Sequence, residues 1–327
     1  MREDDSKGDR SIQAPETLNL YLVLLKFRFS PINIVQEAPN ISTHIPPHAD
    51  SLLLFADIVK GYGNNDWRYD FVKTALFRRF DREYPESLHY SKEYGVPLSS
   101  TLIPVLRRED SRIELYLPTR YPRVLSVIME GNFVTLNRLY KVEGLLRQER
   151  LWIRKRDDIA KLALVGEGFL NIRRVVSGIS AGSGGYRAID LSVKIPIEYL
   201  STELAFFASI SDYGKLVEEL EVLKRSGIGK KRDMGFGDLI SWGIYKVLFN
   251  RYEIKILDPM ILLYREHNYF RIITLRNLPA AIINVLRQRG RLLTINMKAI
   301  LSSTRPPYWV RKELCLMPFS EFLLKSD

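Results

Sequence analysis

The chain contains very little cysteine and histidine. Cys315 is its one cysteine, and four histidines are scattered over 327 residues. A single cysteine excludes an intrachain disulfide and a cysteine-rich metal site. Histidines this far apart do not form a zinc-binding pattern. The sequence therefore predicts neither a bound metal nor another cofactor.

Long apolar runs and a secretion signal are also missing. No apolar stretch approaches the ~20 residues that are needed to cross a bilayer. The first residues, MREDDSKGDRS, are polar and of mixed charge, unlike a secretory signal. We expect residues 1–15 to form a disordered tail, and we expect a cytoplasmic protein with no membrane partner.

What the chain has in excess is positive charge. Its 49 Lys and Arg residues outnumber 38 Asp and Glu residues, which gives a net charge of +11. The hydrophobic fraction of 46% is ordinary for a globular protein. A polyanion such as RNA is the natural partner of such a chain, provided that the basic residues cluster.

The apolar pattern predicts an alternation of strands and helices. From Thr17, TLNLYLVLLKFRFS alternates as a strand, and one of its faces turns basic at Lys26 and Arg28. Helical spacing follows over 52–61 and again from Asp212 to Ser226, and a further helical piece is expected over 69–80. Asp212 can cap the start of the 212–226 helix, and Gly227 can end it. The stretches LSVKIPI and DLISWGIYKVLF, before and after the 212–226 helix, are typical of strands. Residues 85–125 have the composition of loops joining short strands, and the charged segment 139–163 predicts an exposed helix or ribbon.

This order predicts an α+β fold with a ferredoxin-like (RRM-like) βαββαβ core. The core would occupy residues 16–250 and carry a long insertion at about 85–190. Residues 251–327 would form a C-terminal extension packed on the core.

The most informative stretch is the glycine-rich segment RSGIGKKRDMGFGDLISW at 225–242. It is not a P-loop, because the residue after Lys230 is Lys231 and carries no hydroxyl for magnesium. It is not a dinucleotide fingerprint either, because it runs from a helix to a strand. A loop that grips a nucleic-acid backbone and a solvated basic turn both remain open.

A second glycine cluster favours the backbone-binding interpretation. NIRRVVSGISAGSGGYRAIDL carries Arg173 and Arg174 before its glycines and Tyr186 and Arg187 after them. An aromatic ring beside an arginine is a surface on which unstacked RNA bases can lie. The alternative is a flexible hairpin whose tyrosine packs on its own strand.

Two further segments give weaker hypotheses. THIPPHAD places His44 and His48 at a helix start, where a general base for RNA cleavage could sit, although isolated histidines are more often structural. The segment SSTRPPYWV (302–310), with Arg305, Tyr308 and Trp309, could stack bases or bind a partner, or it could anchor the C-terminal segment.

The segment KLVEELEVLKRSGIGKKRDMGFGDLISW resembles the glycine-rich loop of the RAMP superfamily of CRISPR-associated proteins. Three other segments are similar to the Cas-five-type subunit of type IV CRISPR systems: HADSLLLFA, GSGGYRAIDLSVKIP, and PPYW followed by Cys315 and Pro318. The charged segment 139–163 and the C-terminal extension make this chain longer than that family leads us to expect.

The resemblance implies a guide-RNA-binding subunit of a CRISPR effector ribonucleoprotein that holds the 5′ handle of the crRNA. It would cap a filament of RAMP-type backbone subunits and contact a large subunit. Tyr186 and Arg187 would be secondary contacts. The main RNA contacts would be Gly227, Gly229, Lys230, Lys231, Arg232, Gly235 and Gly237.

Two other hypotheses stay open. One is a metal-independent endoribonuclease that processes precursor crRNA with His44 or His48 as the base. The other is a scaffold whose basic surface serves protein contacts only. We expect RNA binding without catalysis.

Overall fold

The structure is a computed structural model that describes most of the chain. The described residues are 19–28, 48–61, 84–119, 123–141, 146–154, 186–194, 201–227, 237–248, 254–297, 299–305 and 313–325. None of the helices in these ranges combines the length and apolar content required to cross a bilayer.

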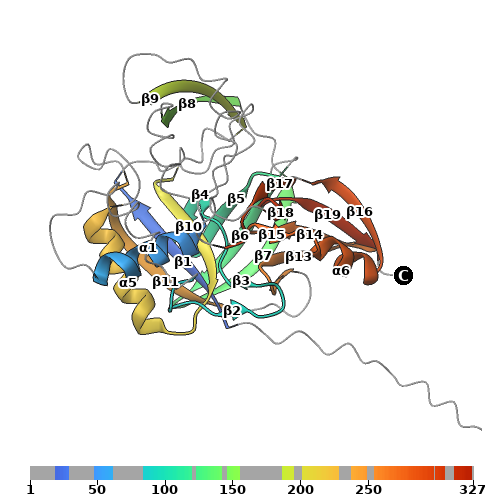
Figure 1. Cartoon of the computed structure of the whole chain (residues 1–327), viewed down its shortest axis with the longest axis horizontal. Coiled ribbons are helices and arrows are strands. Elements are labelled where there is room, and N and C mark those ends of the chain that lie inside the picture. Colours follow the sequence, from blue (N-terminus) through green and yellow to red (C-terminus); the bar gives the residue numbers. More distant parts are fainter. Residues whose placement is uncertain are drawn as a thin grey trace, which may run out of the picture.

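A closed seven-stranded β-barrel forms the centre of the protein (Figure 1). Its neighbouring strands are antiparallel except at one seam, where β11 and β7 run parallel and close the barrel. In the order around the barrel they are β1 (Leu20–Phe27), β10 (Glu203–Ser209), β4 (Ile103–Glu109), β5 (Arg112–Leu117), β6 (Arg123–Glu130), β7 (Phe133–Lys141) and β11 (Leu239–Leu248).

Two helices cover the outside of the barrel over β1, β10 and β11. They are α1 (Ala49–Gly61) and α5 (Tyr213–Ser226), and they contact each other. Alternation along β1 explains the arrangement: Val23, Leu25 and Phe27 pack with the two helices, whereas Leu22 and Leu24 point into the barrel. The predicted strand from Thr17 and both helices are therefore confirmed in these ranges.

Local capping residues fix the ends of α5 as the sequence predicts. The Asp212 side chain accepts a hydrogen bond from the Lys215 amide at 3.0 Å. At the other end Gly227 has φ 69°, and its N–H donates to the Leu223 carbonyl at 2.8 Å. Glycine adopts this positive φ without steric cost.

The prediction of a ferredoxin-like α+β core is wrong. The described chain is mostly β, and its sheet closes into a barrel. The error lies largely in residues 85–125, which we expected to hold loops joining short strands. Residues 103–141 instead supply the strands β4, β5, β6 and β7. These strands continue the sheet from β4 around to β11, so no open four-stranded sheet remains.

A second error concerns the strand that precedes α5. The first four residues of the predicted strand LSVKIPI form the end of β9 (Tyr186–Lys194), and its last three lie outside the described residues. Strand β9 pairs with β8 (Leu146–Arg154) in a separate two-stranded ribbon. The strand before α5 in the barrel is β10, whose seven residues are all buried. A strand buried on both faces has no alternation and is hard to recognise in a sequence.

Two smaller sheets follow the barrel. The five-stranded sheet has the order β12 (Ile254–Leu257), β13 (Ile261–Glu266), β14 (Tyr269–Thr274), β19 (Glu321–Lys325) and β16 (Arg291–Asn296). The three-stranded sheet contains β15 (Leu278–Pro279), β18 (Glu313–Leu316) and β17 (Ala299–Ser302). Helix α6 (Ile282–Gln288) packs beside them, and β2 (Tyr90–Ser91) pairs with β3 (Val96–Pro97).

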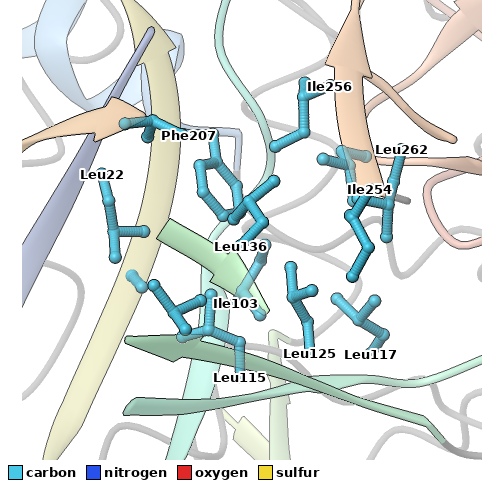
Figure 2. Packing of buried hydrophobic residues seen from close by; sticks show 14 of the residues in the cluster. Leu22, Ile103, Leu115, Leu117, Leu125, Leu136, Phe207, Ile254, Ile256 and Leu262 are labelled. Carbon is cyan, nitrogen blue, oxygen red and sulfur yellow. The ribbon is translucent and has the colours of Figure 1, made fainter. Parts of the chain in front are cut away.

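One hydrophobic cluster is shared by the barrel and the five-stranded sheet. Figure 2 shows Leu22, Leu125 and Phe207 of the barrel in the same cluster as Ile254 and Leu262 of β12 and β13. The domain boundaries stay a prediction, and the tail 1–15 and the predicted helix at 69–80 lie outside the described residues.

A fully buried arginine links the N-terminal part of the chain to the C-terminal sheets. The Arg276 guanidinium donates to Asp50 Oδ2 at 3.1 Å and to the carbonyls of Thr304 at 2.6 Å and Ser99 at 3.2 Å. It also donates to the Pro97 carbonyl. Both Arg276 and Asp50 are 0% exposed, so their charges have no access to water.

We predict that Asp50→Ala lowers the free energy of unfolding by about 3–5 kcal/mol, since it leaves a buried guanidinium without its counter-charge. Urea unfolding at pH 7 measures this. The matched control is Asp110→Ala in the exposed β4–β5 turn, which should cost less than about 0.5 kcal/mol. Equal losses in the two variants would contradict the structural role of the pair.

A buried carboxyl lies between α1 and α5. Glu219 is 1% exposed and accepts a hydrogen bond from Ser87 Oγ at 2.5 Å. Burial raises the pKa of Glu219 to about 10, and the neighbouring Asp57 carboxylate contributes in the same direction. The Ser87 hydroxyl acts in the opposite direction, but it is outweighed.

We predict that Glu219 makes the protein less stable as the pH rises. A raised folded-state pKa adds stability that is complete below pH 4.5 and is lost as the pH rises to about 10. Glu219→Gln removes this dependence, so its stability relative to the parent should rise by up to about 1.4 kcal/mol per pH unit. Unfolding at pH 5, 7 and 9 measures the slope, and Glu218→Gln on the exposed side of α5 is the control. The prediction would be refuted if the free energy of unfolding of Glu219→Gln relative to the parent were as independent of pH as that of Glu218→Gln.

Candidate nucleic-acid interface

The two ends of the glycine-rich loop are attached to one end of the barrel. Gly227 ends α5, and Gly237, with φ 73°, leads into β11. The predicted contacts between them, Gly229, Lys230, Lys231, Arg232 and Gly235, lie outside the described residues.

The exit of this loop is bonded to the end of β1. Arg28 Nε donates to Asp238 Oδ2 at 2.7 Å, and the Arg28 amide donates to the Asp238 carbonyl at 3.0 Å. Lys26 and Arg28 are exposed, as the basic end of this strand predicts. The start of β11 therefore lies beside two cations at the end of β1.

Three further side chains meet at this end, on the inner side of the barrel wall. Arg108 Nη1 donates to Glu203 Oε1 at 2.8 Å, and Arg108 Nη2 donates to Tyr245 Oη at 3.4 Å. Glu203 is buried and lies directly across from Lys26 in the β1–β10 ladder. Within the described ranges Lys26 has no carboxylate within ion-pair distance.

The ion pair with Glu203 raises the pKa of Arg108. Burial lowers the pKa of the Arg108 guanidinium, but Glu203 and Tyr245 more than offset this effect, so the pKa is raised. Glu203 holds one side of the guanidinium, while the Arg108 side chain stays 39% exposed. An arginine held in this way presents a preorganised donor to an anion that reaches the barrel end.

Gly243 makes room for the Tyr245 ring. A Cβ at Gly243 would lie 2.9 Å from Tyr245 Cε2 and 3.0 Å from its hydroxyl oxygen. The tyrosine thus lies across its own strand, two residues back, and carries its hydroxyl to Arg108. A half-buried ring whose hydroxyl is bonded to a cation is suited to stacking against a nucleobase.

Two more arginines border this end on the β4–β5 hairpin, and both are paired. Arg107 Nη2 bonds to Glu109 Oε1 at 2.5 Å, and Arg112 Nη2 bonds to Glu114 Oε1. These pairs balance their own charge. Among the described cations named here, Lys26 is the one whose charge is not balanced by a carboxylate within ion-pair distance.

The second glycine cluster is described only where β9 begins. Tyr186 and Arg187 pair with Arg154 and Ile153 in the β8–β9 ribbon, whereas Arg173 and Arg174 lie outside the described residues. In Figure 1 this ribbon is separate from the barrel, on the side where β1 ends and β10 begins.

The described histidine candidate is part of the interior. His48 is 2% exposed, and its Nε2 accepts a hydrogen bond from the Asn277 amide at 2.9 Å. This nitrogen lone pair is occupied, so it is not free to take a proton from a substrate. His44 lies outside the described residues. In the described ranges no three His, Cys, Asp or Glu side chains gather where they could hold a metal ion.

The late aromatic segment is described only at its start. Arg305 Nη1 donates to Tyr90 Oη at 3.1 Å, which attaches residue 305 to the β2–β3 hairpin. Tyr308 and Trp309 lie outside the described residues.

Sequence reasoning missed the inner part of this site. Arg108 and Glu203 are 95 residues apart, and neither stands in a recognisable motif. One available signal was Gly243, an unexplained glycine in a strand two residues before an aromatic residue, which can mark close packing.

No protein-family model matches this chain, and a search of curated proteins finds no match either. The functional interpretation therefore rests on the chemistry of the barrel end and on the sequence motifs.

We predict that Gly243→Ala destabilises the protein when residue 245 is tyrosine and stabilises it when residue 245 is alanine. In the parent protein the new methyl group displaces the tyrosine ring and lowers the free energy of unfolding. In a Tyr245→Ala background the same substitution should stabilise by about 0.5–1 kcal/mol, because alanine restricts the unfolded chain. The double-mutant cycle, measured by urea unfolding, should show a coupling of at least about 0.5 kcal/mol. Additive effects of the two substitutions would show that the position of the Tyr245 ring does not depend on Gly243.

Proposed function

We propose that this protein binds single-stranded RNA at the end of the barrel where β1 ends and β11 begins. The observation that carries the proposal is the attachment of the glycine-rich loop, through Asp238 and Arg28, beside Lys26, Arg108 and Tyr245. Loop amides and the basic triplet would contact phosphates, and Tyr245 would stack on a base.

The charge of the barrel end supports a backbone-binding role. Its acids are engaged by arginines, so an incoming phosphate meets Lys26 and the loop cations first. Contacts of this kind position a strand without reading its sequence. Any preference for particular bases would come from the ring of Tyr245 and the fixed guanidinium of Arg108.

A narrower form of the proposal comes from the resemblance to the RAMP superfamily. In that form the RNA is the 5′ handle of a crRNA, and the partners are RAMP-type backbone subunits and a large subunit of a CRISPR effector complex. This form depends on the sequence motifs alone, because the barrel differs from the ferredoxin-like fold that the resemblance implies. The endoribonuclease alternative has less support, since His48 is buried and bonded to a backbone amide.

We predict that replacing Lys230, Lys231 and Arg232 together by alanine weakens RNA binding and flattens its salt dependence. Each phosphate contact to single-stranded RNA contributes a slope of about −0.7 in log K against log [salt], so the slope should fall in magnitude by roughly 2. Fluorescence anisotropy with a labelled 20-nucleotide RNA between 50 and 300 mM KCl measures both effects.

The matched control removes the same charge elsewhere. Arg287, Arg289 and Arg291 are exposed at the far side of the C-terminal sheet, and their triple alanine variant should keep the parent slope. Equal losses in the two triple variants would refute a site at the barrel end. Sequencing the RNA that co-purifies with the protein tests the narrower form: 5′ ends derived from repeats support it, and random cellular fragments contradict it.

A further inference from the structure

Strand β16 is an open edge of the five-stranded sheet. It pairs with β19 on one side, and within the described residues no strand pairs with its other side. In Figure 1 it lies at the right-hand end of the described part of the chain, away from the barrel. Every second residue of such an edge turns its N–H and C=O groups outward, where another strand can bind them.

The edge also exposes apolar side chains. Leu293 is 40% exposed and Met297 is 48% exposed, whereas Leu292 on the opposite face packs beside α6. Packing on α6 and pairing with β19 hold the strand in place before any partner arrives. Charges or prolines usually protect open edges; here the charges stand at the beginning of the edge, and the exposed apolar residues that follow on a preformed edge indicate a binding surface.

A group of exposed cations surrounds the beginning of this edge. Arg291 pairs with Lys325 across the ladder, and Gly290 brings the chain so close that a Cβ would lie 2.4 Å from the Lys325 carbonyl oxygen. Because the chain passes so close to Lys325, two more arginines lie near the same corner of the sheet. They are Arg287 in the last turn of α6 and Arg289 at its C-cap. Within the described residues none of these four cations forms an ion pair.

We propose that the β16 edge binds an extended, acidic peptide segment of a partner protein, which adds a strand to the five-stranded sheet. The outward N–H and C=O groups would supply affinity, Leu293 and Met297 would contact apolar side chains, and the cations would attract acidic ones. A second copy of this chain fits less well, because RLLTIN carries no acid to meet the cations. A nucleic acid cannot continue a β-ladder, and this edge exposes no aromatic plane on which a base could stack.

The test uses the parent protein and a fluorescent eight-residue peptide that alternates glutamate with valine. We expect saturable binding. A peptide that is N-methylated at alternate residues keeps the charge and loses the ladder hydrogen bonds, so it should bind at least tenfold more weakly. A peptide with lysine in place of glutamate should lose binding by the same factor.

On the protein side, an Arg287→Glu/Arg289→Glu double variant should weaken binding at least tenfold. Arg265→Glu, at an exposed residue of β13 in the same sheet, should leave binding within twofold of the parent. Circular dichroism checks that each variant is folded. The comparison with the methylated peptide uses the parent protein, so it does not depend on the folding of any variant.

Several outcomes would overturn the proposal. These are absence of saturable binding, equal binding of the methylated peptide, and displacement of the peptide by a single-stranded oligonucleotide at similar concentration. Self-association of the parent in sedimentation experiments that is abolished by Leu293→Glu would instead assign the edge to a second copy of the chain.

Discussion

The buried guanidinium of Arg276 holds together parts of the chain that the barrel alone does not connect. Its donors reach the start of α1 at Asp50, the hairpin carbonyls of Pro97 and Ser99, and the C-terminal Thr304. Each acceptor would be costly to leave unpaired in the interior, so all of them constrain one another. The position of α1 over the barrel and the position of the C-terminal sheets are thereby coupled.

A second buried charge joins the same two parts. Glu321 of β19 is 0% exposed and accepts from Arg123 of β6 at 2.9 Å and from Arg271 of β14. Together with the shared hydrophobic cluster, these bonds tie the five-stranded sheet to the barrel wall. The β16 edge and the barrel end with the glycine-rich loop therefore lie on one connected body, at places far apart in the fold.

The sequence predicted the parts of this fold that short-range physics decides. The alternation of β1 and the Asp212 and Gly227 caps of α5 each depend on residues a few positions apart. Barrel closure does not, because it depends on the pairing of β7 with β11, which no local pattern specifies. The same reason separates the two halves of the site: the glycine loop is a contiguous motif, whereas Arg108, Glu203 and Tyr245 meet only in the folded chain.

The position of β1 in the barrel has a consequence for how the protein is made. Both partners of β1, the strands β10 and β11, lie near residue 200 and beyond. At roughly 5–20 residues per second, a ribosome needs on the order of ten seconds or more to reach them. During that interval a strand that is apolar on both faces waits unpaired outside the exit tunnel. Its sequence is a ready substrate for a chaperone, and its folding rate is limited by distant contacts and not by local propensity.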